Sequence, residues 1–327
     1  MQILQKTNYN FIKWRWHALA LSLVIIIAGM ATIATKGLPL GIDFTGGTVV
    51  RVRFDRVVSA EEVQAAVAAV PGEKTIQQIS GDKGPEWLIR LPQMAGQEEG
   101  RSLEAGQRAV FDALNNSNLK SYESMGTTAI GPIVGQELRK KGVYATLTAL
   151  LGIMVYIALR FRLTFAVGAI AATLHDILIV IVFLTWFGYD FSLNIVAAIL
   201  TITGYSVNDT IVVFDRVREN LRNKRRDRLE DVVNASVNDT LSRTIITAGT
   251  TFLAVAGLYL FGGPVLEGFA FTMLVGIIAG TYSTIFIASA IAILLSGRKA
   301  TGGGTAAAVA ADAPAPARPR RGRRAGA

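Results

Sequence analysis

The chain has 327 residues, 51% of them hydrophobic, and a formal net charge of +9. Its long charge-poor runs are typical of an integral membrane protein and argue against a soluble enzyme built around a large core. The absence of cysteine excludes disulfides, thiolate metal sites and cysteine nucleophiles. Because no residue pattern indicates a metal site, a cofactor or enzymatic chemistry, we expect none of the three.

Six apolar runs are long enough to cross a hydrocarbon core of roughly 30 Å as helices. The first run follows a basic start, as a cleaved signal peptide would. It is longer than a typical signal core, and its removal would leave an odd number of spans. We therefore predict a polytopic α-helical membrane protein with six spans, at residues 18–35, 143–159, 163–187, 192–214, 244–261 and 268–295.

The connections between the spans differ in their content of Lys and Arg. The N-terminal segment, the link between the second and third spans and residues 215–243 are basic, whereas residues 188–191 and 262–267 contain neither Lys nor Arg. The positive-inside rule then places both termini in the cytoplasm. The net charge follows from this topology and requires no nucleic-acid partner, although the arginines would also attract anionic lipid.

These observations divide the chain into five parts. The last part is rich in Gly, Ala, Pro and Arg without periodicity and is predicted to be disordered. The parts are a cytoplasmic N-terminus (1–17), the first span (18–35), an extracytoplasmic domain (36–142), the remaining spans (143–296, with the basic loop 215–243) and the tail (297–327).

The segment between the first two spans has the pattern of a small α+β domain. Residues 47–54 alternate apolar and basic side chains, which indicates a half-buried strand. Ser59 and Glu62 have the spacing of a helix capping box. The predicted order is β-α-β-β-α-β, a ferredoxin-like domain, with later strands at 76–80, 87–91 and 120–129 and a second helix at 101–114.

The glycine-rich segment GIDFTGG, at residues 41–47, invites comparison with a phosphate-binding loop. It leads into a strand rather than a helix N-terminus, and it lies on the extracytoplasmic side, so nucleotide binding is not expected. We interpret the glycines as the turn by which the chain leaves the membrane for the sheet. Asp43 within this segment is a minor functional candidate.

Asp209 is the main candidate, because it lies inside the fourth predicted span. The seventeen residues 192–208 before it carry no charge, and it would lie roughly 8 Å from the basic end of the span. An ionised carboxylate at this depth is costly, so such residues face the bundle interior or a wet cavity and mark an ion or proton path. A structural hydrogen bond between helices is the alternative interpretation.

Arg243 begins the fifth span on the same side of the membrane as Asp209. Two helices joined by one cytoplasmic loop pack antiparallel, so Arg243 can approach Asp209 and favour its ionised form, in opposition to burial. Taken alone, Arg243 would be interpreted as a boundary arginine whose side chain reaches toward the headgroups.

The fourth span also carries a stripe of polar and small side chains. Asn194, Thr201 and Asn208 recur at seven-residue spacing, with Tyr205 among the residues between them. Small and hydroxyl-bearing residues favour close contact with another helix rather than with lipid. We therefore predict that this stripe supports Asp209 at a helix interface. The sequence Gly276-x-x-x-Gly280 in the sixth span also indicates close helix packing.

His175 and Asp176 are adjacent near the middle of the third span. Burial disfavours the charged form of both groups, so either could exchange protons near neutral pH. They are candidates for a proton relay, and a satisfied structural pair is the alternative.

Several motifs together resemble the SecD/SecF family of bacterial protein-export membrane proteins, which belongs to the resistance-nodulation-division superfamily. The resemblance covers about residues 8–295 and follows its smaller member. The motifs are DFTGG (43–47), IGPIVGQELRKKGV (130–143), HDIL (175–178), GYSVNDTIVVFDRVREN (204–220) and LSRTIITAGTT (241–251).

The resemblance implies half of a twelve-span unit whose other half is a SecD subunit. It also implies association with the SecYEG channel in the bacterial inner membrane, where the proton gradient helps exported preproteins to leave the channel. In that family the acid of the NDT motif and the arginine of the SRT motif are proton-pathway residues, and these correspond to Asp209 and Arg243. A structural subunit without a proton relay, or half of a small-molecule exporter, are the alternatives.

Overall fold

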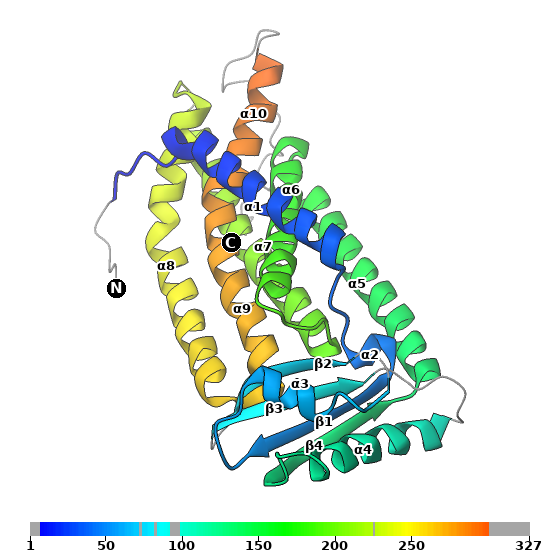
Figure 1. Cartoon of the computed structure of the whole chain (residues 1–327). Helices are drawn as coiled ribbons and strands as arrows, with labels where there is room; N and C mark the ends of the chain where they lie inside the picture. Colours follow the sequence, from blue (N-terminus) through cyan, green and yellow to red (C-terminus); the bar gives the residue numbers. More distant parts are fainter. Residues whose placement is uncertain (1–6, 72–73, 82–83, 92–98, 225, 301–327) are drawn as a thin grey trace, which may run out of the picture.

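The computed structural model describes residues 7–71, 74–81, 84–91, 99–224 and 226–300. A bundle of long helices stands on a small four-stranded sheet domain (Figure 1). Within the described residues, six helical segments are long and apolar enough to cross a membrane, as predicted from the sequence. They are α1 (Arg15–Lys36), α5 (Pro132–Arg160), α6 (Leu163–Trp186), α7 (Leu193–Asn223), α8 (Leu229–Phe261) and α9 (Gly263–Ser283), which continues through the π-helical turn η2 (Thr284–Ala288) into α10 (Ser289–Ala300).

Three helices extend well beyond the predicted spans. α5 begins eleven residues before the predicted start at 143, and α8 begins fifteen residues before 244. Together with α7, α8 makes most of the expected basic loop 215–243 a helical hairpin, with a short connection after residue 223. Hydropathy marks where a helix meets the hydrocarbon core, and a helix that continues into water can carry charged residues on every turn.

The sheet domain has the predicted ferredoxin-like topology. Its strand order is β2-β3-β1-β4, and every neighbouring pair is antiparallel. Each helix therefore crosses over one strand, α3 between β1 and β2 and α4 between β3 and β4. The elements are β1 (Gly47–Phe54), α3 (Ala60–Ala66), β2 (Thr75–Gly81), β3 (Gly84–Leu91), α4 (Glu99–Asn115) and β4 (Tyr122–Ile130).

Alternate side chains of the strands are apolar, and those on one face of the sheet form the core of this domain. Val50 and Val52 of β1 and Ile89 of β3 are fully buried against Val63 of α3 and Val110 of α4. The expected capping box of Ser59 and Glu62 starts α3. The helix ends at Ala66, and irregular turns follow it.

The glycine motif joins the sheet to the membrane helices through the short helix α2 (Ile42–Thr45). Gly46 and Gly47 adopt positive φ angles of 72° and 130°, which turn the chain from α2 into β1. A Cβ atom on Gly135 of α5 would lie 2.9 Å from the Gly46 nitrogen, so the two backbones nearly touch. The motif therefore has a structural role, because it seats the first strand directly against α5.

The same motif is bonded to the loop between α6 and α7. The Gly41 amide donates to the Phe191 carbonyl at 2.6 Å, and Asp43 Oδ2 accepts from the Leu193 amide at 2.8 Å. Asp43 thus caps the first turn of α7, which favours a negative charge at that end. Arg90 of β3 forms an ion pair with Asp190 in this loop. Burial raises the pKa of Asp190, and the positive charge of Arg90 opposes that rise.

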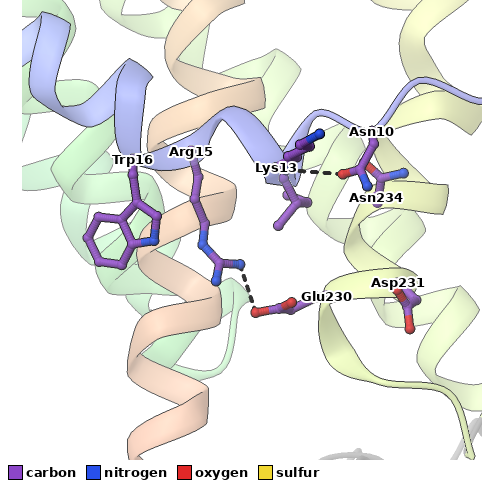
Figure 2. A pocket seen from close by; sticks show the side chains of 8 residues that line it. Asn10, Lys13, Arg15, Trp16, Glu230, Asp231 and Asn234 are labelled. Carbon is purple, nitrogen blue, oxygen red and sulfur yellow. Dashed lines mark hydrogen bonds and ion pairs between the residues drawn. The ribbon is translucent and has the colours of Figure 1, made fainter.

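At the opposite end of the bundle, the N-terminal segment lies against the start of α8 (Figure 1). Asn234 and Asn238, one turn apart on α8, exchange four hydrogen bonds of 2.8 to 3.0 Å with the backbone of residues 9–11. A cavity of about 200 Å³ adjoins this segment, and two of its lining residues, Arg15 and Glu230, form an ion pair of 2.7 Å; Figure 2 shows how the lining side chains lie. Residues 9–11 are thereby bonded to the extension of α8 that lies beyond its predicted span.

Candidate functional site in the helix bundle

Asp209 lies on the side of α7 that faces α8. Its Oδ1 atom accepts a 2.7 Å hydrogen bond from the Thr244 hydroxyl of α8. Its Oδ2 atom is buried and has no partner among the described residues. An unpaired buried carboxylate oxygen is costly, and that cost is smaller when the oxygen carries a proton. The geometry therefore suits a carboxyl group that gains and loses a proton.

 Arg243 is exposed at the start of the apolar part of α8, and among the described residues no hydrogen bond or ion pair joins it to Asp209. Thr244, the next residue, makes the contact with Asp209 instead, and Arg243 acts on Asp209 only through its charge. The sequence indicated that the two helices meet near Asp209, but it did not indicate Thr244 as the hydrogen-bond partner. Thr244 could have been predicted as the partner, because it carries a hydroxyl and follows Arg243 directly, so its side chain leaves the helix in a different direction, toward α7.

The polar stripe of α7 lies on the outside of the bundle. Asn194, Thr201 and Asn208 are exposed, and Tyr205 is half-buried. A Cβ atom on Gly204, in the same stripe, would meet no atom within 4 Å. The stripe is therefore not brought against another described helix of this chain. The opposite side of α7 packs against α6, α8 and α9.

His175 and Asp176 are buried at the centre of the bundle, with 7% and 2% of their surfaces exposed. His175 Nδ1 lies 3.0 Å from Asp176 Oδ1. Asp176 Oδ2 accepts hydrogen bonds from Ser206 of α7 at 2.5 Å and from Ser283 of α9 at 2.8 Å. His175 Nε2 lies 2.9 Å from the Ser22 hydroxyl of α1. The pair therefore joins four helices in one polar network.

The residues expected to form a proton relay thus fall into two groups. Asp209 and Thr244 form one group between α7 and α8, and the network around His175 and Asp176 forms the other. Ser206 lies one turn before Asp209 on α7, so the groups are neighbours along that helix without a direct bond between their carboxyls. The sequence did not indicate Ser206 and Ser283 as members of this network, because a single hydroxyl in an apolar run is only a weak indication of a functional site.

A π-helical turn lies beside the second group. Thr284, its first residue, is 2.9 Å from Thr210 of α7, hydroxyl to hydroxyl, and the Ser289 hydroxyl donates to the Thr284 carbonyl at 3.1 Å. Such turns interrupt the regular ladder of an α-helix and are frequent at functional sites.

Comparisons with known proteins agree with this architecture. The family model for the C-terminal part of the protein-export membrane proteins SecD and SecF matches residues 110–298, and the model for the SecD/SecF GG motif matches residues 32–56. The chain belongs to the SecD/SecF family. In this chain, the residues matched by the GG-motif model include the segment that seats β1 against α5 and caps α7.

Individual members of the family match most of the chain. The protein translocase subunit SecF of Desulfurispirillum indicum is 44% identical over 283 residues, which cover 85% of this chain and 89% of the relative. The subunit of the same name from Escherichia coli O157:H7 is 37% identical over 287 residues, 88% of each chain.

Solved structures of the family contain a longer chain. A crystal structure of SecDF, a translocon-associated membrane protein from Thermus thermophilus, matches with a TM-score of 0.78 and 36% identity, covering 89% of this chain and 39% of that one. A structure of SecDF in a super-membrane-facing form matches with a TM-score of 0.66 at the same identity. This chain therefore spans about two fifths of the length of the SecDF chains.

Proposed function

We propose that this protein is a subunit of the bacterial Sec export machinery that couples the proton gradient to the movement of exported polypeptides. The observation that carries the proposal is the carboxyl group of Asp209, which lies inside a membrane helix with one oxygen bonded to Thr244 and the other buried without a partner. The energy source is the proton gradient, so the proposal includes neither enzymatic chemistry nor a cofactor.

The exposed stripe of α7 is the proposed contact with a SecD subunit. Its members Asn194, Thr201 and Asn208 would meet lipid if the chain stood alone, and polar side chains in a membrane are favourable only against a partner or water. The longer SecDF chains have more than twice the length of this chain, which leaves room for a second half. A partner on this stripe would lie beside Asp209.

In the proposed mechanism, a proton from outside binds Asp209 and changes its interaction with Thr244 and with the charge of Arg243. α7 then shifts against α8. Because Asp43 of the glycine motif caps the outer end of α7, the shift reaches the sheet domain. One charge that crosses 100 mV supplies about 2.3 kcal/mol, enough to bias a two-state element more than tenfold.

The proposed setting is the bacterial inner membrane, with both termini in the cytoplasm and the sheet domain outside. Lys and Arg gather at the end of the bundle that carries the α7–α8 connection, which supports this orientation. The proposed partners are a SecD subunit, the SecYEG channel and the exported preproteins, together with the surrounding lipid.

Export by vesicles that contain the matched SecD and SecYEG tests the proposal. With Asp209→Asn at equal assembly, we expect the part of export that depends on the proton gradient to disappear while ATP-driven export persists. Asn keeps the size of the side chain and a hydrogen bond to Thr244 but cannot ionise. Asp239→Asn, at an acid of the same two-helix hairpin beyond the predicted span, is the matched control and should export normally. Normal gradient-dependent export by Asp209→Asn would instead favour a structural subunit.

A further inference from the structure

We propose that His175 and Asp176 form a second proton-binding site, and that α1 senses whether this site holds its proton. The inference deepens the proposed function and rests on it only for the source of the proton. The argument begins with the hydrogen-bond donors of the network, because each hydroxyl has one proton to donate.

The donors and acceptors of the network can be assigned one after another, starting from Tyr282. Tyr282 of α9 donates its single proton to the Ala18 carbonyl of α1 at 2.7 Å. Its oxygen can then only accept, and it does so from the Ser22 hydroxyl at 3.3 Å. Ser22 has thereby used its own proton, so the 2.9 Å contact between Ser22 and His175 requires a proton on His175 Nε2.

A proton on Nε2 determines what lies between His175 and Asp176. Either Nδ1 carries a second proton and donates to the carboxylate, or Nδ1 is bare and accepts from a protonated Asp176. In both cases the pair holds one shared proton between Nδ1 and Oδ1 and has no net charge. A neutral pair is favoured at this depth, because a buried net charge is costly. The arrangement in the structure is therefore the proton-loaded state.

Loss of this proton changes the partner of Ser22. The unloaded pair has a net negative charge, and the remaining imidazole proton is best placed on Nδ1, where it donates to the Asp176 carboxylate. Nε2 then becomes an acceptor and receives the hydrogen bond of the Ser22 hydroxyl, so the bond from Ser22 to Tyr282 is lost. Ser206 and Ser283 continue to donate to Oδ2 in both states. The change is thus confined to the contacts of α1.

The surroundings permit this response. A cavity of about 220 Å³ lies beside the network and is lined by His175, Ser22 and Tyr282 together with apolar side chains of α1, α6 and α9. Space next to Ser22 and Tyr282 allows the two helices to shift. The end of α1 leads within five residues to Gly41 and the glycine motif, so movement of α1 acts on the sheet domain.

Few other titratable groups act on the pair. Among the described residues, Tyr282 of α9 is the titratable side chain in the network besides the pair itself, and α1 contributes only Ser22. On α7, Ser206 contacts the pair, while Asp209 is bonded to Thr244 of α8. Among the described residues, no hydrogen bond joins the pair to Asp209.

Nitrogen NMR of the assembled complex in lipid vesicles tests the inference, with only this chain labelled with ¹⁵N-histidine. The chain has two histidines, so His17→Gln leaves His175 as its single signal. We expect Nε2 to be protonated at acid pH and bare at alkaline pH. In Asp176→Asn the amide can donate to Nδ1, so Nε2 should stay protonated throughout. An Nε2 state that does not change with pH, or a change that persists in Asp176→Asn, would overturn the proposal.

The response of α1 is measured with a spin label on Leu38→Cys, just after α1, since the chain has no cysteine of its own. We expect a pH-dependent change in label mobility that Ser22→Ala abolishes. Ser289→Ala is the matched control, because this buried hydroxyl bonds only to the backbone of its own helix. Asp209→Asn should retain the change, which separates this inference from the proposed role of Asp209. Retention of the change in Ser22→Ala would refute sensing by α1.

Discussion

Gly276 of α9 offers a quantitative test of the packing that holds the functional site. A Cβ atom built on Gly276 would lie 2.2 Å from Ile202 Cγ1 of α7, whereas carbon atoms pack at about 3.5–4.0 Å. Gly276→Ala must therefore separate the helices by roughly 1 Å or force Ile202 into another rotamer. Such overpacking costs about 1–3 kcal/mol, more than the roughly 0.5–1 kcal/mol that Ala contributes over Gly in a helix.

If this contact is present, truncation of Ile202 should offset part of the loss of stability caused by Gly276→Ala. Ile202→Ala alone removes a buried side chain and should cost about 2–5 kcal/mol. It also removes the atoms nearest to the new methyl group, so the double variant should be more stable than the sum of the single effects by about 1–2 kcal/mol. Denaturant unfolding of the purified chain in detergent measures all four proteins.

A matched control comes from α8. A Cβ atom on Gly257 would meet nothing within 4 Å, so Gly257→Ala should be neutral or slightly stabilising. If the losses in free energy of unfolding caused by Gly276→Ala and Ile202→Ala add to within about 0.5 kcal/mol in the double variant, the close approach of α7 and α9 is refuted.

Three further predictions concern the partner surface and the outer end of α7. Gly204→Leu should leave the unfolding of the isolated chain unchanged but reduce its co-purification with SecD, because a Cβ atom on Gly204 would meet no described atom within 4 Å. Asp43→Ala should destabilise the chain by about 0.5–2 kcal/mol in thermal unfolding, since it removes a cap of α7. Burial raises the pKa of Asp190, so the folded state binds the extra proton and stability falls as pH rises from the unfolded value through the folded one. Arg90→Gln should move this loss of stability to higher pH, and Asp190→Asn should abolish it in the same pH series of unfolding curves.

Sequence patterns predicted the sheet domain in detail because its core follows simple alternation. Val50 and Val52 point to one side of β1, and the matching positions of β3 complete the same layer. The number of spans also followed from sequence, since each apolar run is separated from the next by polar residues. The ends of α5 and α8 did not, because nothing in hydropathy distinguishes a polar helix outside the membrane from a polar loop.

The sequence singles out the titratable residues of the candidate site but not the way the structure groups them. Asp209, His175 and Asp176 are conspicuous because a charged or titratable side chain is rare in an apolar run. Which hydroxyls meet them depends on the rotation and tilt of neighbouring helices, which is set by close contacts such as that of Gly280 against Ser206. The stripe of α7 has the residue pattern of a helix interface, but it packs against none of the described helices of this chain, so its role as an interface stays a prediction.

α7 links the two polar groups of the bundle to the sheet domain. Its inner part carries Asp209 and Ser206, so both polar groups act on the same helix. Its outer end is capped by Asp43, which belongs to the motif that begins the sheet domain. α1 reaches that motif from the other side, through the residues before Gly41. In the proposed mechanism, a proton at either site acts on the sheet domain through this same short segment, and the close approach of Gly46 to Gly135 holds that segment against α5.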